Sequence, residues 1–220
     1  MCGRFALAAT GEEVAIQYEL PIVPFIVPRY NIAPTQPVAA VRLNGRGERE
    51  LTHFQWGLIP SWAKDPSMGA KLINARSETA AEKPSFRAAF KRRRCLLPAT
   101  GFYEWRKLNG GKQPMYIHAA GGGLMSLAGL WEVWHAPDGG ELETCTILTT
   151  AANGLMAPIH DRMPVIIDPH DYTMWLDEKT PADQLGHLLR PSDDDRLATY
   201  AVSTAVNSPK NDSIELIDPI

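Results

Sequence analysis

Apolar and polar residues alternate with a period of two over much of this chain. That spacing is typical of strands with one face in a core and the other in solvent. Residues 37–43 and 50–58 alternate on either side of the turn NGRG, and they predict a β-hairpin. The same pattern predicts further antiparallel strands over residues 95–107, 114–120, 124–136 and 141–150, and a closing strand over 197–204.

Other segments have helical composition. The longest should begin with Ser77 as its N-cap and break at Pro84. Asp168 and Pro169 are the typical N-cap and first residue of another helix. The predicted helices span residues 11–20, 77–94, 171–178 and 181–189.

Residues 21–37 contain five prolines, which exclude a continuous helix or a central strand. The Ile, Val and Phe residues there are too apolar for a free linker, so we expect an extended segment packed on the core. No repeat, low-complexity tract or interior linker divides the chain. The sequence predicts one α+β domain over residues 1–220, a mostly antiparallel, strongly curved β-sheet core flanked by short helices.

Composition supports a globular protein, with 45% hydrophobic and 21% charged residues. No apolar run approaches a membrane span, and Glu12 and Glu13 interrupt any signal-peptide core. We therefore expect no membrane partner and a cytoplasmic location. The net charge of −3 argues against indiscriminate nucleic-acid binding, although clustered arginines allow a local phosphate-binding groove. The basic run at 91–94 is interpreted as a solvated helix end rather than part of that groove.

The three cysteines cannot all pair, and their spacing matches no zinc motif. This indicates a reducing compartment, with Cys95 and Cys145 as inert core thiols. No HExxH motif supports a metal site, and we expect neither a metal nor a cofactor.

Cys2 differs from the other cysteines because removal of Met1 would leave it with a free α-amine beside its thiol. These groups titrate near pH ~8 and ~8.5, so a usable fraction of each is nucleophilic at neutral pH. Amine and thiol can both attack one carbonyl carbon. The alternative is an incidental terminal cysteine.

Further polar residues lie where a strand or loop does not need them. Glu104 lies among the aromatic residues of GFYEW; burial there would raise its pKa and suit a general acid, whereas simple alternation would expose it. Asn74 and Arg76 precede a helix whose cap would require only Ser77. His160 lies beside an aspartate, a pair that can move protons but is weak evidence alone.

Two nearby tryptophans lie in WGLIPSW. We expect Trp56 in the core, while Trp62 is more open to a role in stacking on nucleic-acid bases.

Together these stretches resemble one family, the SRAP (SOS-response-associated peptidase-like) proteins, which shield abasic sites in single-stranded DNA. The matching segments run in family order through nearly the whole chain. They are CGRF at 2–5, RYNIAPTQ at 29–36, WGLIPSWAKD at 56–65, INARSET at 73–79, RCLLPATGFYEW at 94–105, TILTTAAN at 146–153, IHDRMPVI at 159–166 and VSTAVNSPKND at 202–212. The loops at 106–113 and 135–141 carry no information on function.

The resemblance implies a covalent reaction. The α-amine of Cys2 would form a Schiff base with the aldehyde of an opened abasic sugar, and its thiol would close a thiazolidine. Glu104 would shuttle protons, and His160 would assist ring opening and the slow reversal. Asn74 would orient Cys2 or the sugar. Peptidase activity would concern only what precedes Cys2, and lyase activity stays open.

The resemblance also implies how DNA is bound. Arg4, Arg76 and Arg162 would contact phosphates, since a guanidinium suits that geometry. Pro34 and Trp62 would wedge and stack against the bases beside the lesion. The expected partner is single-stranded DNA containing abasic sites, bound by a monomer at damaged DNA in the nucleoid.

Two other classes of function remain open. An N-terminal-nucleophile cysteine peptidase or amidohydrolase would also use Cys2, but the sequence shows neither a glutamine pocket nor a second domain. A noncovalent reader of single-stranded DNA would bind normally without Cys2 and would never form a heat-stable complex.

Overall fold

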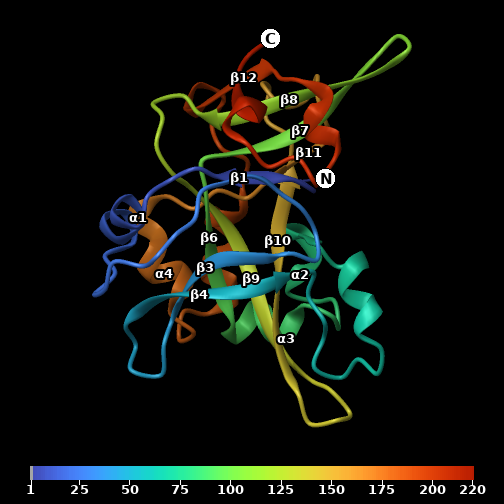
Figure 1. Ribbon diagram of the computed structural model, residues 1–220. Helices are drawn as coiled ribbons and strands as arrows, with labels where there is room; N and C mark the ends of the chain where they lie inside the picture. The colour runs from blue at the N-terminus through green and yellow to red at the C-terminus, as the bar shows by residue number, and fades with distance from the viewer. Residues whose placement is uncertain (1) are drawn as a thin grey trace.

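The computed structural model describes residues 2–220, so removal of Met1 concerns a residue outside the described part of the chain. The described strands form two sheets, stacked along the length of the molecule (Figure 1). The upper sheet has the order β12-β8-β7-β1-β2. Its strands are β1 (Phe5–Leu7), β2 (Arg29–Ile32), β7 (Gly101–Leu108), β8 (Gly111–Ala119) and β12 (Leu197–Ala201).

The second sheet has the order β11-β10-β4-β3-β6-β9, with β5 beside β10. Its strands are β3 (Pro37–Leu43), β4 (Arg49–Trp56), β5 (Asn74–Arg76), β6 (Arg94–Ala99), β9 (Met125–His135), β10 (Glu141–Ala151) and β11 (Arg162–Pro164). Because β9 pairs with both β6 and β10, this sheet curves back on itself. Most pairs are antiparallel; β10 runs parallel to β4 and β5. The α+β class with a mostly antiparallel sheet is confirmed.

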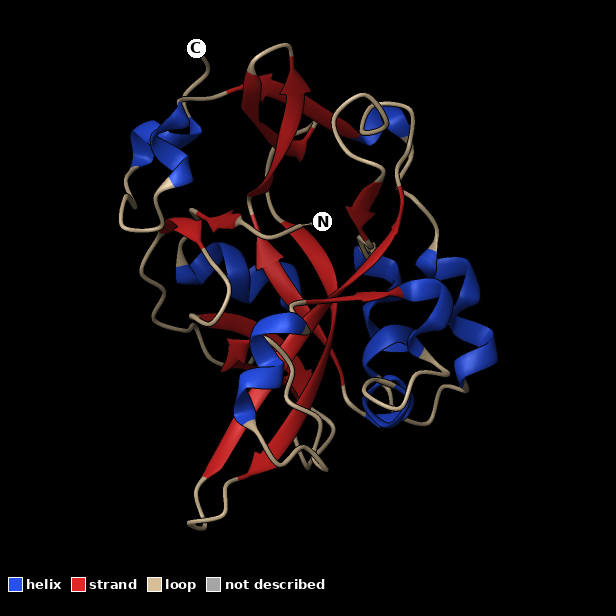
Figure 2. Ribbon diagram, turned by 90° about the vertical axis from the view of Figure 1, so that its right-hand side faces the viewer, coloured by secondary structure: helices blue, strands red, loops and turns tan. Residues whose placement is uncertain are grey.

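Short helices lie around the sheets (Figure 2). The first begins with a capping box, in which Thr10 and Glu13 bond each other's backbone N–H groups. The α-helices are α1 (Gly11–Tyr18), α2 (Ser77–Ala80), α3 (Arg87–Arg92) and α4 (Tyr172–Leu176); the longer 3₁₀ segments are Pro66–Lys71 and Ala182–Leu189. No helix within residues 2–220 has the length and apolar character to span a bilayer.

The two sheets share a core between them. Phe5 on β1 packs edge-on against Trp56 at the end of β4, with ring centroids 5.3 Å apart. Both side chains are buried, as are Cys95 and Cys145, which agrees with the sequence prediction for Trp56 and the two thiols. This contact brings the N-terminus in the upper sheet next to the ends of the strands in the lower one.

Three local predictions need correction. Ser77 is the first helical residue of α2, and Arg76 occupies the N-cap without a side-chain bond. The basic run at 91–94 is a solvated helix end only at Lys91 and Arg92, which are exposed in the last turn of α3. Arg94 is buried, and its guanidinium donates to the carbonyls of Trp175 (2.5 Å) and Phe90 (2.7 Å), among others. A cation can be buried when backbone carbonyls surround it, which a run of basic letters does not reveal.

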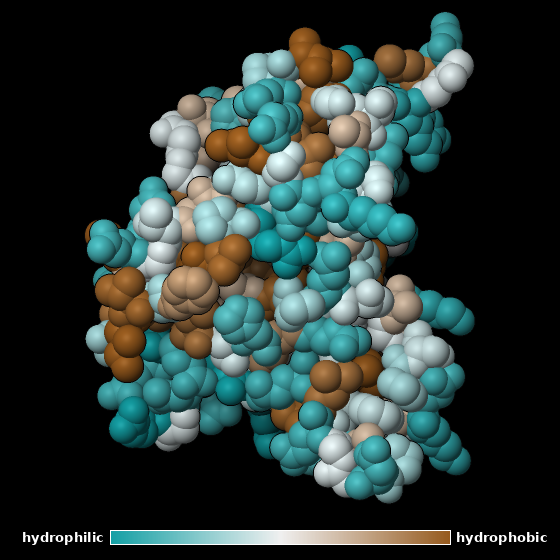
Figure 3. Space-filling view, viewed as in Figure 1, coloured by the Kyte–Doolittle hydropathy of each residue, from teal (hydrophilic) through white to brown (hydrophobic). Residues whose placement is uncertain are grey.

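The third correction concerns residues 21–28, which are extended but do not bury their side chains as predicted. Phe25 is 88% exposed and Ile22 78%. The backbone packs against the start of α1, where a Cβ on Gly11 would lie 1.9 Å from the Pro24 carbonyl oxygen. Most side chains of this segment face solvent, and apolar surface is visible on the left in Figure 3, where Figure 1 places α1 and this segment.

Candidate active site

Cys2 lies just before β1, alongside the strand that carries Glu104. The pairing Phe5↔Phe102 and the bond from the Tyr103 N–H to the Arg4 carbonyl (2.9 Å) set this register. Cys2 is fully buried. Burial, with a contribution from the Glu104 charge, raises the pKa of the Cys2 thiol far above its usual range. The thiol is therefore protonated at neutral pH.

Asn74 holds the Cys2 backbone in place. Its Nδ2 donates to the Cys2 carbonyl oxygen at 2.9 Å. Asn74 opens β5, whose parallel pairing with β10 (Ile147↔Asn74) fixes its position. The Asn74 Oδ1 is buried and accepts no hydrogen bond from residues 2–220. One end of this amide orients Cys2, and the other can accept a bond from a ligand.

Glu104 is only 3% exposed, so alternation on β7 turns it inward rather than to solvent. Burial raises the pKa of the Glu104 carboxyl, while the nearby His160 lowers it in part. A carboxyl with a raised pKa keeps a proton at higher pH than an exposed one, as a general acid requires.

His160 is oriented by its own chain. Its Nδ1 lies 3.0 Å from the Arg162 backbone nitrogen and 2.9 Å from an Asp161 carboxylate oxygen. The first contact needs an unprotonated Nδ1 and the second a protonated one. The backbone bond therefore belongs to a ring that carries its proton on Nε2 alone, and the contact with Asp161 to a ring protonated on Nδ1.

Arg4, two residues after Cys2, is half-buried and has no carboxylate partner within residues 2–220. Its guanidinium donates to Asn31 Oδ1 (2.7 Å) and to the Val206 carbonyl (2.8 Å), and lies 5.9 Å from the Trp105 ring centre. Burial lowers the pKa of Arg4. A partly desolvated cation held by neutral groups is well prepared to receive an anion.

Arg162 and Arg76 have different surroundings. Arg162 forms a two-pronged ion pair with Glu78 (2.6 and 2.8 Å) and donates to the Thr149 carbonyl (2.6 Å). Arg76 is exposed opposite Thr149 across β5 and β10. A phosphate on Arg162 would therefore compete with, or share, its bond to Glu78.

Pro34 and Trp62 lie outside the contacts that join Cys2, Asn74, Glu104 and His160. Pro34 is half-buried in the turn after β2, next to Thr35, whose φ is 69°. Trp62 is 57% exposed, and its indole N–H reaches the Pro84 carbonyl at 3.5 Å. An exposed indole is available for stacking, as the sequence suggested.

A cavity of about 580 Å³ opens beside Glu104 and His160. Its walls include Trp105 and residues 157–161. Lys107 and Lys112 also line it, although the sequence had marked 106–113 as uninformative. Sequence reasoning also missed Asn31 and Glu78, which contact Arg4 and Arg162; both lie in the family-like segments, but only geometry assigns their partners.

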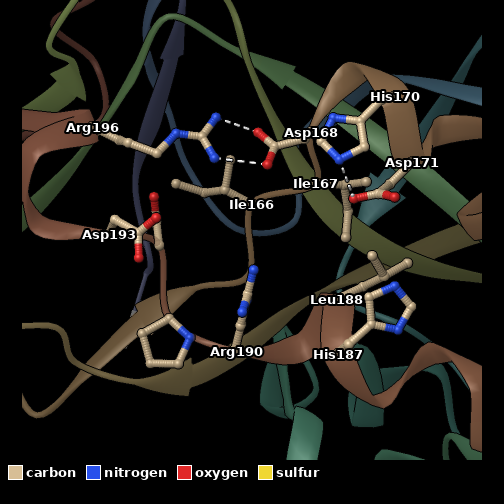
Figure 4. Close-up of a pocket in the computed structure, with 12 residues that line it drawn as sticks. Ile166, Ile167, Asp168, His170, Asp171, His187, Leu188, Arg190, Asp193 and Arg196 are labelled. Atoms are coloured by element: carbon tan, nitrogen blue, oxygen red, sulfur yellow. Dashed lines mark hydrogen bonds and ion pairs between the residues drawn. The ribbon is translucent and has the colours of Figure 1, made fainter.

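A second cavity, of about 350 Å³, is lined by Asp168, His170, Asp171 and Arg196 (Figure 4). Ligand atoms of the first three lie within 4.8 Å of one another. Both Asp168 oxygens accept bonds from Arg196, which neutralises the carboxylate. We therefore assign no metal or catalytic role to this cluster.

Comparison with known proteins gives a consistent result. The family model of SOS response associated peptidase (SRAP) matches residues 1–209. Abasic site processing protein YoqW of Bacillus subtilis is 46% identical over 225 residues, covering 99% of each chain. YedK of Escherichia coli, described in the same terms, is 32% identical over 100% of both chains. A solved structure from Bacteroides thetaiotaomicron superposes with a TM-score of 0.89 and 27% identity over 100% of both chains.

Proposed function

The chain belongs to the SRAP family, and we propose that it processes abasic sites in single-stranded DNA by forming a covalent link through Cys2. Support comes from its relatives in Bacillus subtilis and Gallus gallus, which are described as abasic site processing proteins. The single observation that carries the chemistry is the buried Cys2, held by Asn74 and in electrostatic contact with Glu104.

The proposed reaction begins after removal of Met1. The Cys2 α-amine attacks the C1 aldehyde of the opened sugar, and the carbinolamine loses water to give an imine. The Cys2 sulfur then adds to the imine carbon while the thiol proton moves to the nitrogen, closing a five-membered thiazolidine. Neither an oxidant nor a second substrate is needed.

Surrounding residues would move the protons. Glu104, whose pKa is raised by burial, would donate in its protonated form to the sugar ring oxygen and to the departing hydroxyl. His160, with Nε2–H directed away from its backbone bond, would contact the sugar or its phosphate. Asn74 would fix the amine through the Cys2 carbonyl and accept a bond at its buried Oδ1.

DNA would be held by contacts to its phosphates and its bases. Arg4, Arg76 and Arg162 are the proposed phosphate ligands. Arg4 is the best prepared because it is half-buried and held by neutral groups, whereas Arg162 is paired with Glu78 and Arg76 is exposed. Pro34 and Trp62 would act on the bases beside the lesion.

The thiol's surroundings weigh against a cysteine peptidase. Such enzymes lower the thiol pKa to obtain a thiolate, whereas burial raises the pKa of Cys2. A thiol that adds as S–H to a preformed imine does not need that activation.

The test is a denaturing gel. Protein with Met1 removed is mixed with a single-stranded oligonucleotide carrying one abasic site, then heated in detergent. We expect a heat-stable band that Cys2→Ala abolishes. If no band forms although mass spectrometry confirms Met1 removal, the covalent proposal fails and a noncovalent reader takes its place.

A further inference from the structure

Two lysines on the β7–β8 hairpin line the cavity beside the candidate active site. We propose that Lys107 and Lys112 bind phosphates of the DNA strand next to the abasic nucleotide. This inference rests on the proposed function and adds a contact in a segment outside the family-like motifs of the sequence. The β7–β8 hairpin, here termed the arm, would then follow the DNA strand away from Cys2.

The register of the hairpin supplies the first argument. Lys107 and Lys112 are directly opposite each other on the paired strands. Like charges at such positions repel and weaken the pair. Neither lysine forms an ion pair with any residue in 2–220, so the repulsion is not relieved within the described chain. An anion between the two ammonium groups would relieve it.

The direction of the side chains supplies the second argument. Lys107 and Lys112 are directly opposite each other, so their side chains lie on one face of the hairpin, the face that also carries Trp105. All three residues line the cavity of about 580 Å³ that is also lined by Glu104 and His160.

The lysines continue a path that starts at Arg4. The Arg4 guanidinium lies 5.9 Å from the ring centre of Trp105, which also lines the cavity. Trp105 and Lys107 are two positions apart on one strand face, about 7 Å along it. Figure 1 shows the hairpin projecting from the upper end of the molecule. Cationic side chains thus extend from Arg4, close to Cys2, to the two lysines of the arm. Such a row of positive charges suits the backbone of single-stranded DNA.

Two acids share this cavity. Asp161 is 85% exposed and in contact with His160, and Glu104 is buried. Both lysines are exposed and neither is paired with these acids within residues 2–220, so a phosphate bound between the lysines does not have to displace either carboxylate. Flexible ammonium groups also tolerate any base sequence, which a lesion-directed protein needs.

The experiment measures noncovalent binding, so that it does not depend on crosslinking. A fluorescent single-stranded oligonucleotide carries a tetrahydrofuran abasic analogue, which cannot open to an aldehyde, and anisotropy gives the affinity at several salt concentrations. For Lys107→Ala/Lys112→Ala we expect the slope of log affinity against log salt to fall by about 1.4, since each phosphate contact to a single strand contributes about 0.7. Affinity at low salt should fall about tenfold or more.

The matched control is Lys91→Ala/Lys179→Ala, which removes two exposed lysines near α3 and α4, away from the arm. Its slope should equal that of the wild type. An unchanged slope in the arm variant, or an equal loss in the control, overturns the inference. If the double variant does not fold, Lys107→Gln and Lys112→Gln should each reduce the slope by about 0.7. A wild type that binds but never crosslinks to a true abasic site instead refutes the proposed function.

Discussion

Removing the Asn74 side chain should slow crosslinking because it loosens the backbone that carries the nucleophile. In Asn74→Ala the 2.9 Å bond to the Cys2 carbonyl is lost. Cys2 has no exposed surface, so water cannot easily replace the donor. Leaving a buried carbonyl unsatisfied costs about 1–3 kcal/mol. If that energy is lost from the reactive arrangement, the rate falls about five- to 150-fold.

The assay is a single-turnover time course on the denaturing gel, with excess Asn74→Ala protein over an abasic oligonucleotide. Gln17→Ala is the matched control, because its amide donates to the Tyr172 hydroxyl (2.8 Å) and forms no hydrogen bond within residues 2–220 to Cys2, Asn74, Glu104 or His160. Both variants should lose a comparable amount of stability in urea unfolding, but only Asn74→Ala should crosslink slowly. Equal rates for the two variants would refute the reasoning.

Other predictions follow from the same geometry. A protein that retains Met1 should not crosslink, because the Cys2 nitrogen is then an amide; an undiminished rate on intact-mass-verified material would contradict the thiazolidine scheme. Cys2→Ser should give an imine that borohydride traps but no stable ring, and the absence of a trapped product from folded, DNA-binding protein would count against an imine. Glu104→Gln should be slower, and its rate should lack the decline with rising pH that loss of the Glu104 proton gives the wild type. The same variant should be more stable than the wild type near neutral pH. The raised pKa of the Glu104 carboxyl means that folding disfavours its ionised form. The free energy of unfolding of the wild type therefore falls as the pH rises from the ordinary carboxyl pKa through the raised pKa of the folded protein. Arg94→Met should lose about 3 kcal/mol or more in urea unfolding, because it strands several buried carbonyls; a loss below about 1 kcal/mol would show that water replaces the guanidinium.

Period-two alternation located the strands well, because it reports which residues face a core. It does not report which strands are neighbours. The pattern at 95–107 predicts one strand, yet the chain divides there between the two sheets: β6 pairs in the lower sheet with β9, and β7 pairs in the upper one with β8. Pairing across sequence distance depends on packing between sheets, which local pattern does not contain.

In the candidate site, too, the local sequence pattern indicates candidate residues, whereas packing between distant segments decides how they meet. Alternation and aromatic neighbours left Glu104 equally suited to solvent or core, and only the packed structure turns it inward. The sequence singles out Cys2, Asn74 and His160 and a resemblance suggests their roles, but only the structure gives the interactions that link them, through Glu104 in the case of His160. The Arg162–Glu78 pair could not be foreseen, since its bonds join positions 84 residues apart. The exposed Phe25 shows the converse error, because apolar composition alone does not bury a side chain.

The contact between Arg4 and Val206 joins residues 202 positions apart, and Asn31 secures it with bonds to the carbonyls of Ser208 (3.0 Å) and Asn211 (2.7 Å). During translation at about 5–20 residues per second, Arg4 is made roughly 10–40 s before Val206. A nascent chain therefore exposes Cys2 long before Arg4 acquires its neighbours. In the proposed function, Arg4 would reach its phosphate-binding position only when residues 206–211 dock on β2, so half-made protein on the ribosome would be poorly prepared to capture DNA.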